Sequence, residues 1–144
     1  MTSPDALAAL GAALAVEHET IYAYTVIAAH ADAAADPLAR SAYDAHVKAR
    51  DRLTVLVRAA GGTPVAADPA YAITSPVSDR AGTLALAAAI EDGCAVAYEK
   101  LVVAAADAGL RASAATTLVE CATRAARWRL LAGSRQTVAF PGRG

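Results

Sequence analysis

Apolar residues recur at alternating steps of three and four positions along four separate segments of the chain. This spacing places them on one side of an α-helix. In addition, 42 of the 144 residues are alanine, the strongest helix former. The pattern predicts one all-α domain over residues 1–144. Its helices are expected at about 4–33, 37–60, 80–107 and 111–132.

The connections between these segments differ in length. The first and last pairs of helices are joined by a few residues each, whereas residues 61–79 contain three prolines and no helical periodicity. Such a segment reaches roughly 60 Å when extended, which exceeds the roughly 37 Å length of a 25-residue helix. We therefore expect a four-helix bundle of two antiparallel hairpins joined by the crossover loop 61–79, with an irregular tail at 133–144.

Charge and hydropathy restrict the partners of the chain. The net charge of -1 and the pI of about 6.3 argue against a broad surface for nucleic acid or anionic lipid. No uncharged apolar stretch reaches the roughly 18 residues of a membrane span, and the N-terminus has no basic signal region. We expect a cytoplasmic protein without nucleic-acid or membrane partners. Cys94 and Cys121 are expected to be buried thiols, with a bridge between neighbouring helices as the alternative.

Two glutamates interrupt the apolar sides of the first and third helices. Glu17 and Glu91 each occupy a position that the spacing assigns to the core, and His46 does so in the second helix. A buried carboxylate costs several kcal/mol unless it is paired, hydrogen-bonded, protonated or bound to a metal. Three explanations are a metal site, exposed placement, and a buried polar network, which we favour. The partners in such a network would be Tyr24, Tyr98, His46 or Arg50.

The chain also carries an internal repeat. Residues 16–29 (VEHETIYAYTVIAA) and 90–103 (IEDGCAVAYEKLVV) align at an offset of 74, which pairs Glu17 with Glu91 and carries His46 onto Glu120. Together with the motifs EHETIYAY, ARDRL, PAYAITSPV, ARWR and AFPG, this arrangement resembles the ferritin-like superfamily. More narrowly, it is similar to an alanine-rich ferritin-like family of actinobacteria whose function is unknown.

The resemblance implies a di-iron or di-manganese centre with a glutamate from each of two helices and a Glu-x-x-His pair from each of the others. The positions that match it are Glu17, His46, Glu91 and Glu120. Tyr43 and Thr123 stand where the remaining glutamate and histidine would be. At most four of six ligands are therefore present. Counting from the hairpin turn also places Glu17 and His46 about 10 Å apart along the bundle axis.

These observations favour a ferritin-like protein with an incomplete metal centre and no cofactor. It would act as a binding or structural module and form a homo-oligomer, in the first instance a dimer. No Gly-rich phosphate loop, HExxH motif or nucleophile elbow supports another enzyme class. The alternative is an iron or manganese protein with oxygen, peroxide or metal-handling chemistry.

Overall fold

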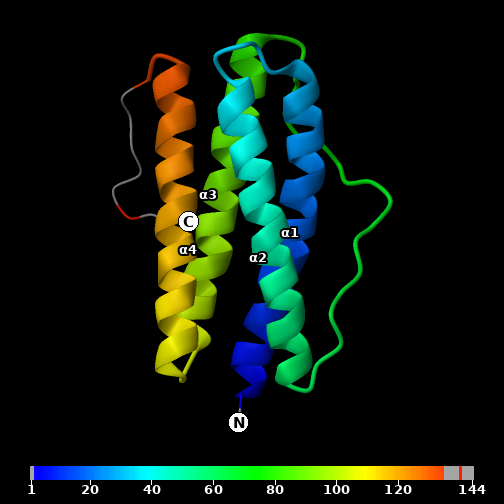
Figure 1. Cartoon of the computed structure of the whole chain (residues 1–144), viewed down its shortest axis with the longest axis vertical. Helices are drawn as coiled ribbons and strands as arrows, with labels where there is room; N and C mark the ends of the chain where they lie inside the picture. Colours follow the sequence, from blue (N-terminus) through cyan, green and yellow to red (C-terminus); the bar gives the residue numbers. More distant parts are fainter. Residues whose placement is uncertain (1, 135–139, 141–144) are drawn as a thin grey trace.

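Four long helices lie side by side in the computed structural model, which describes residues 2–134 and 140 (Figure 1). No strand occurs in this part of the chain. Each helix covers more than 20 residues, so all four extend along most of the molecule. The helices are α1 (Pro4–His30), α2 (Asp36–Ala59), α3 (Arg80–Ala104) and α4 (Ala108–Leu131).

The relative directions of the four helices follow from the lengths of the segments that connect them. Short turns make α1 antiparallel to α2 and α3 antiparallel to α4, and the crossover runs along the outside of the molecule beside α1 (Figure 1). As a result, α2 and α3 run in the same direction. Helix α1 packs against α2 and α3, and α3 packs against α1 and α4. The crossover is attached to α1, where His18 Nε2 lies 3.0 Å from the carbonyl oxygen of Val65.

Side-chain caps determine where three of the helices begin. Ser3 Oγ accepts a hydrogen bond from the Ala6 backbone at 3.1 Å, and the carboxylates of Asp79 and Asp107 cap α3 and α4 in the same way. The cap by Asp107 starts α4 three residues before the position expected from sequence. Helices α1 and α3 each end three residues before theirs, at His30 and Ala104.

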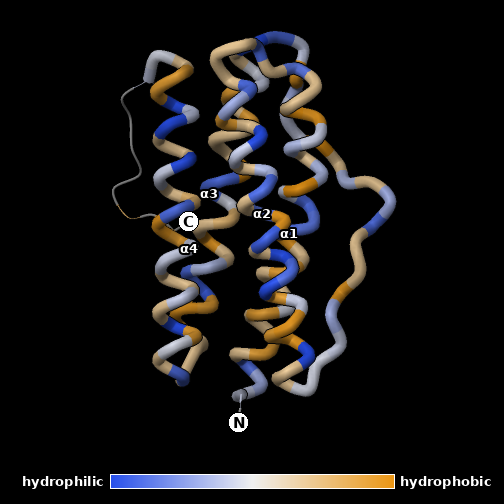
Figure 2. The backbone as a smooth tube through the Cα atoms, viewed as in Figure 1, coloured by the Kyte–Doolittle hydropathy of each residue, from blue (hydrophilic) through white to orange (hydrophobic). Residues whose placement is uncertain are grey.

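The core consists of two apolar clusters along the bundle. One gathers around Leu10, Leu14 and Leu101, and the other around Ile27 and Trp128. Hydrophilic residues recur between hydrophobic ones along each helix, as expected for helices with one buried side (Figure 2). On α1 the two clusters are separated by the buried polar residues Glu17 and Thr20. After Tyr24, the next buried residue of α1 is Ile27, whereas Ala28, the position expected from the sequence, is exposed.

Helix α3 is long and apolar enough to qualify as a membrane span by length and composition, although the sequence has no uncharged stretch of that length. In the structure, 56% of the qualifying 18-residue window is buried inside the protein. A buried core helix has the same composition and length, so this property is weak evidence for a span.

Candidate functional site: a buried polar centre

His46 lies between two glutamates at the centre of the bundle. Its Nδ1 is 2.6 Å from Oε2 of Glu17, and its Nε2 is 3.0 Å from Oε1 of Glu91. The exposed fraction of each of the three residues is 1% or less. The imidazole therefore bridges a carboxylate of α1 and a carboxylate of α3 from its place on α2.

The expected separation of Glu17 and His46 along the bundle axis is wrong. Because α1 ends at His30 and α2 begins at Asp36, Glu17 lies 13 residues before the end of α1 and His46 lies 10 residues after the start of α2. The remaining difference is roughly three residues, or about 4.5 Å of helical rise. Glutamate and histidine side chains are long enough to span this distance, and the two residues form a direct hydrogen bond.

Two tyrosines exchange hydrogen bonds across the internal repeat. Tyr24 of the first copy donates to Glu91 Oε1 of the second at 2.5 Å, and Tyr98 of the second copy donates to Glu17 Oε1 of the first at 2.6 Å. The two hydrogen bonds thus link α1 and α3 reciprocally. Trp128 on α4 extends the network, since its Nε1 donates to Tyr24 Oη at 2.9 Å.

Arg124 of α4 supplies the cation of the network. Its Nε donates to Glu91 Oε1 at 2.8 Å, and only 12% of its side chain is exposed. Its Nη2 also lies 3.5 Å from Nε2 of His46, the outer limit of a hydrogen bond. Because both nitrogens are donors when His46 is charged, we assign His46 Nε2 to Glu91, which is nearer.

Arg50 does not belong to this network, contrary to the sequence-based expectation. Its guanidinium donates to the neighbouring Asp51, at 2.7 and 2.9 Å. Sequence spacing did not identify Arg124, because this residue lies one step from the apolar side of its helix. The signal that could have identified Arg124 is the length of the arginine side chain, which can reach into the core from a position beside the buried side of a helix.

The pKa values follow from burial and from these contacts. Burial alone would lower the pKa of His46, but its hydrogen bonds to Glu17 and Glu91 outweigh burial and raise it to about 9. Burial would raise the pKa of Glu91, but His46 and Arg124 lower it. Burial and the nearby Glu91 raise the pKa of Tyr24. At neutral pH, the imidazolium of His46 and the guanidinium of Arg124 therefore lie beside the ionised carboxylate of Glu91.

The remaining positions of the implied ligand set lie away from this centre. Glu120 is exposed on α4, and the side chain of Thr123 donates to the Val119 carbonyl oxygen of its own helix at 2.7 Å. Tyr43 is 37% exposed. Of the four candidate ligands from the sequence, the structure brings together Glu17, His46 and Glu91 but not Glu120. These residues do not supply the donor set of a carboxylate-bridged di-metal centre.

Two buried thiols adjoin the polar centre. Cys94 and Cys121 are free cysteines with no exposed surface. Thr20 Oγ1 lies 3.1 Å from Cys94 Sγ, and Arg124 Nη2 donates to Cys121 Sγ at 3.4 Å. A hydrogen bond to Cys121 and burial raise the pKa of the Cys94 thiol. Donor atoms of Glu17, His46 and Cys94 all lie within 4.8 Å of one another.

The second carboxylate oxygen of Glu91 has a different environment. Oε2 is buried and has no hydrogen-bond partner among the described residues. The three donors to Glu91, from Tyr24, His46 and Arg124, all converge on Oε1. Concentrating the donors on one oxygen leaves the other with spare hydrogen-bonding capacity.

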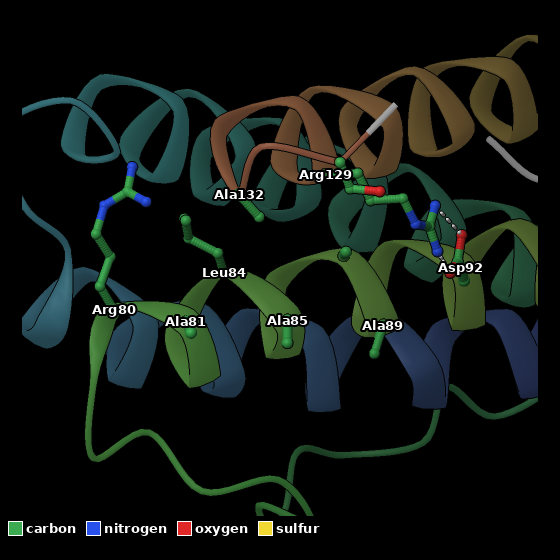
Figure 3. Close-up of a pocket in the computed structure, with 10 residues that line it drawn as sticks. Arg80, Ala81, Leu84, Ala85, Ala89, Asp92, Arg129 and Ala132 are labelled. Atoms are coloured by element: carbon green, nitrogen blue, oxygen red, sulfur yellow. Dashed lines mark hydrogen bonds and ion pairs between the residues drawn. The ribbon is translucent and has the colours of Figure 1, made fainter. Parts of the chain in front are cut away.

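A separate pocket of about 490 Å³ lies on the outer side of α3 and α4 (Figure 3). Its walls include Leu84, several alanines and two arginines. Both arginines are paired: Arg129 binds Asp92 through two hydrogen bonds, and Arg80 binds Asp32 at 2.7 Å. The pocket is therefore largely apolar, and its cations are already neutralised.

Comparisons with known proteins bear on this fold. A family model described as Domain of unknown function (DUF4439) matches residues 9–144. The chain belongs to the DUF4439 family. This DUF4439 domain is also similar to the crystal structure of a conserved hypothetical protein, rv2844, from Mycobacterium tuberculosis. The two share 36% sequence identity with a TM-score of 0.88, over 95% of this chain and 97% of that chain. No curated protein matches the DUF4439 chain.

Proposed function

We propose that this DUF4439 domain is a ferritin-like bundle with an incomplete metal centre, and that it acts as a binding or structural module rather than as a di-metal oxidase. The observation that carries the proposal is the position of Arg124. Its guanidinium lies 2.8 Å from Glu91, so a protein cation already neutralises a carboxylate that the ferritin-like resemblance assigns to the metals.

Charge supports the same interpretation. Two divalent ions would bring four positive charges to a buried centre with two carboxylates, one imidazole and one guanidinium. The ligands that would offset that charge are missing, since Tyr43 and Thr123 replace a glutamate and a histidine. Uncompensated charge in a core costs several kcal/mol. The parallel directions of α2 and α3 and the long crossover support the ferritin-like arrangement of the helices.

Metal loading tests the proposal. The purified full-length chain is incubated anaerobically with Fe²⁺ or Mn²⁺, passed over a desalting column and analysed for metal per chain. We expect less than one iron or manganese per chain. A value close to two in the wild type, lost in a Glu17→Gln variant that stays helical, would overturn the proposal in favour of a carboxylate-bridged iron or manganese protein.

The homodimer expected from the sequence is part of this proposal. Val119 and Leu130 on α4 are large apolar residues that are 60% and 65% exposed. Exposed apolar side chains of this kind could pack against a second copy of the chain. Light scattering during gel filtration measures the mass directly. A mass of one chain across a wide concentration range would remove the dimer from the proposal without affecting the assignment of the core.

A further inference from the structure

We propose that Glu17, His46 and Cys94 form a binding site for one divalent cation of the zinc class at the centre of the bundle. This inference rests on the proposed function, since it names a ligand for the core of the binding module. Each residue offers one ligand atom, and these atoms lie within 4.8 Å of one another. They come from α1, α2 and α3, so the fold rather than a local motif brings them together.

The donor set selects the class of ion. It combines a carboxylate oxygen, an imidazole nitrogen and a thiol sulfur, all from buried residues. Zinc accepts all three donor types in four-coordinate sites, whereas manganese and magnesium prefer oxygen. Three protein donors also leave one coordination position open, as in zinc sites that bind a small ligand.

Surrounding hydrogen bonds already orient two of the three ligands. Tyr98 donates a hydrogen bond to Oε1 of Glu17, and the other carboxylate oxygen, Oε2, lies next to His46. When Nδ1 of His46 binds the ion, Nε2 remains hydrogen-bonded to Glu91 at 3.0 Å. A histidine ligand whose second nitrogen donates to a carboxylate is the usual arrangement in zinc proteins. Glu91 is thus a positioning residue rather than a ligand.

Charge balance supports an ion with two positive charges. Glu17 would bind the ion as a carboxylate and Cys94 as a thiolate, because zinc ligands bind in their deprotonated forms. These two negative ligands offset the charge of one divalent ion, and His46 binds as a neutral imidazole. Glu91 and Arg124 already form an ion pair beside the site. One bound ion therefore leaves no isolated charge in the core.

A pocket provides an approach to the thiol. It has a volume of about 250 Å³ and lies between the crossover and helices α1 and α3. Thr20 lines this pocket, and its Oγ1 is 3.1 Å from Cys94 Sγ. A hydrated ion that enters beneath the crossover would therefore meet Thr20 before Cys94.

Cobalt titration tests this site in the full-length chain after treatment with a chelator and its removal. We expect one Co²⁺ per chain, a near-ultraviolet charge-transfer band from the Cys94 thiolate, visible bands of a four-coordinate ion, and loss of all bands on addition of Zn²⁺. Calorimetry with Zn²⁺ in buffers of different ionisation enthalpy should show proton release on binding, because the Cys94 thiol loses its proton when it binds the ion.

Two cysteine variants form a matched pair, because both thiols are fully buried and adjoin the same centre. Cys94→Ser should lose the charge-transfer band and bind Co²⁺ at least tenfold more weakly, whereas Cys121→Ser should retain both properties. Circular dichroism verifies that each variant is folded. The site is wrong if wild-type protein binds no Co²⁺, binds it without a thiolate band, or loses the band in Cys121→Ser but not in Cys94→Ser. None of these results implies two iron or manganese ions per chain, so failure of this site leaves the proposed function standing.

Discussion

Arg124 donates from Nε to Oε1 of Glu91 at 2.8 Å, and this ion pair joins α4 to the polar centre that α1, α2 and α3 share. The other polar contacts of α4 at that centre are the hydrogen bond from Trp128 to Tyr24 and the one between Cys121 and Cys94. The ion pair also brings a fixed positive charge to the place where the ferritin-like resemblance implies metal ions. Several consequences of this arrangement are measurable.

Replacing Arg124 by glutamine should destabilise the protein by about 3 kcal/mol, because Glu91 then keeps a buried charge without its guanidinium partner. Arg127 is exposed on the same helix, so Arg127→Gln is the matched control and should change stability by less than about 0.5 kcal/mol. Urea unfolding followed by circular dichroism measures both values. Equal effects of the two substitutions would contradict the assigned role of Arg124.

Tyr98→Phe should cost about 2 kcal/mol, because Glu17 Oε1 loses a hydrogen bond of 2.6 Å inside the core. Tyr43, which is 37% exposed, provides the control Tyr43→Phe, with an expected change below about 0.5 kcal/mol. Thermal and urea unfolding should rank the two variants in this order. A neutral Tyr98→Phe substitution would mean that Glu17 has another donor in solution.

Stability should decrease as the pH rises from about 6.5 to 9. The pKa of His46 is raised in the folded protein to about 9, so the stabilisation is complete below its unfolded pKa of 6.5 and is lost through the folded pKa. The full loss is on the order of 3 kcal/mol. The pKa of Glu91 is lowered in the folded protein. Its contribution to the free energy of unfolding is therefore present above the unfolded pKa and is lost as the pH falls through the folded pKa. In a His46→Gln variant, the loss between pH 6.5 and 8.5 should be absent from urea unfolding curves.

Two glycines should respond to alanine in opposite directions. A Cβ on Gly82 would lie 2.3 Å from the backbone oxygen of Pro76, so Gly82→Ala must displace the crossover and should destabilise the protein by more than about 1 kcal/mol. A Cβ on Gly11 meets nothing within 4 Å, and Gly11→Ala within α1 should stabilise the protein by roughly 0.5–1 kcal/mol. The two melting temperatures should shift in opposite directions, and a shared sign would contradict the helix and loop assignments.

Residue periodicity predicted more of the fold than of the site. The spacing along α1 and α3 placed Glu17 and Glu91 in the core, because a helix turns by a fixed angle per residue. Arg124 and Arg50 show where this reasoning fails. Each of these residues lies next to the apolar side of its helix, but the spacing of apolar residues does not specify the direction in which a long side chain extends. Arg124 reaches the carboxylate of Glu91 across the bundle, whereas Arg50 pairs with Asp51, its neighbour in the sequence.

Cys94 shows a second limit of sequence reasoning. Its place on the apolar side of α3 correctly suggested a buried thiol, but nothing along the chain indicated how close it lies to His46. That proximity depends on the packing of α3 against α1 and on the exact end of α1. Both are tertiary properties, and a difference of three residues at one helix end moved the expected contacts by about 4.5 Å.

The central claim is that His46 is protonated between Glu17 and Glu91 in the metal-free core, with Arg124 beside Glu91. Nitrogen-15 NMR of the imidazole in chelator-treated protein tests it most directly, because protonated and neutral ring nitrogens have well-separated chemical shifts. We expect both ring nitrogens of His46 to be protonated at pH 7 and to titrate with a midpoint of about 9. A neutral imidazole at pH 7, with a midpoint at or below the ordinary value of 6.5, would contradict it.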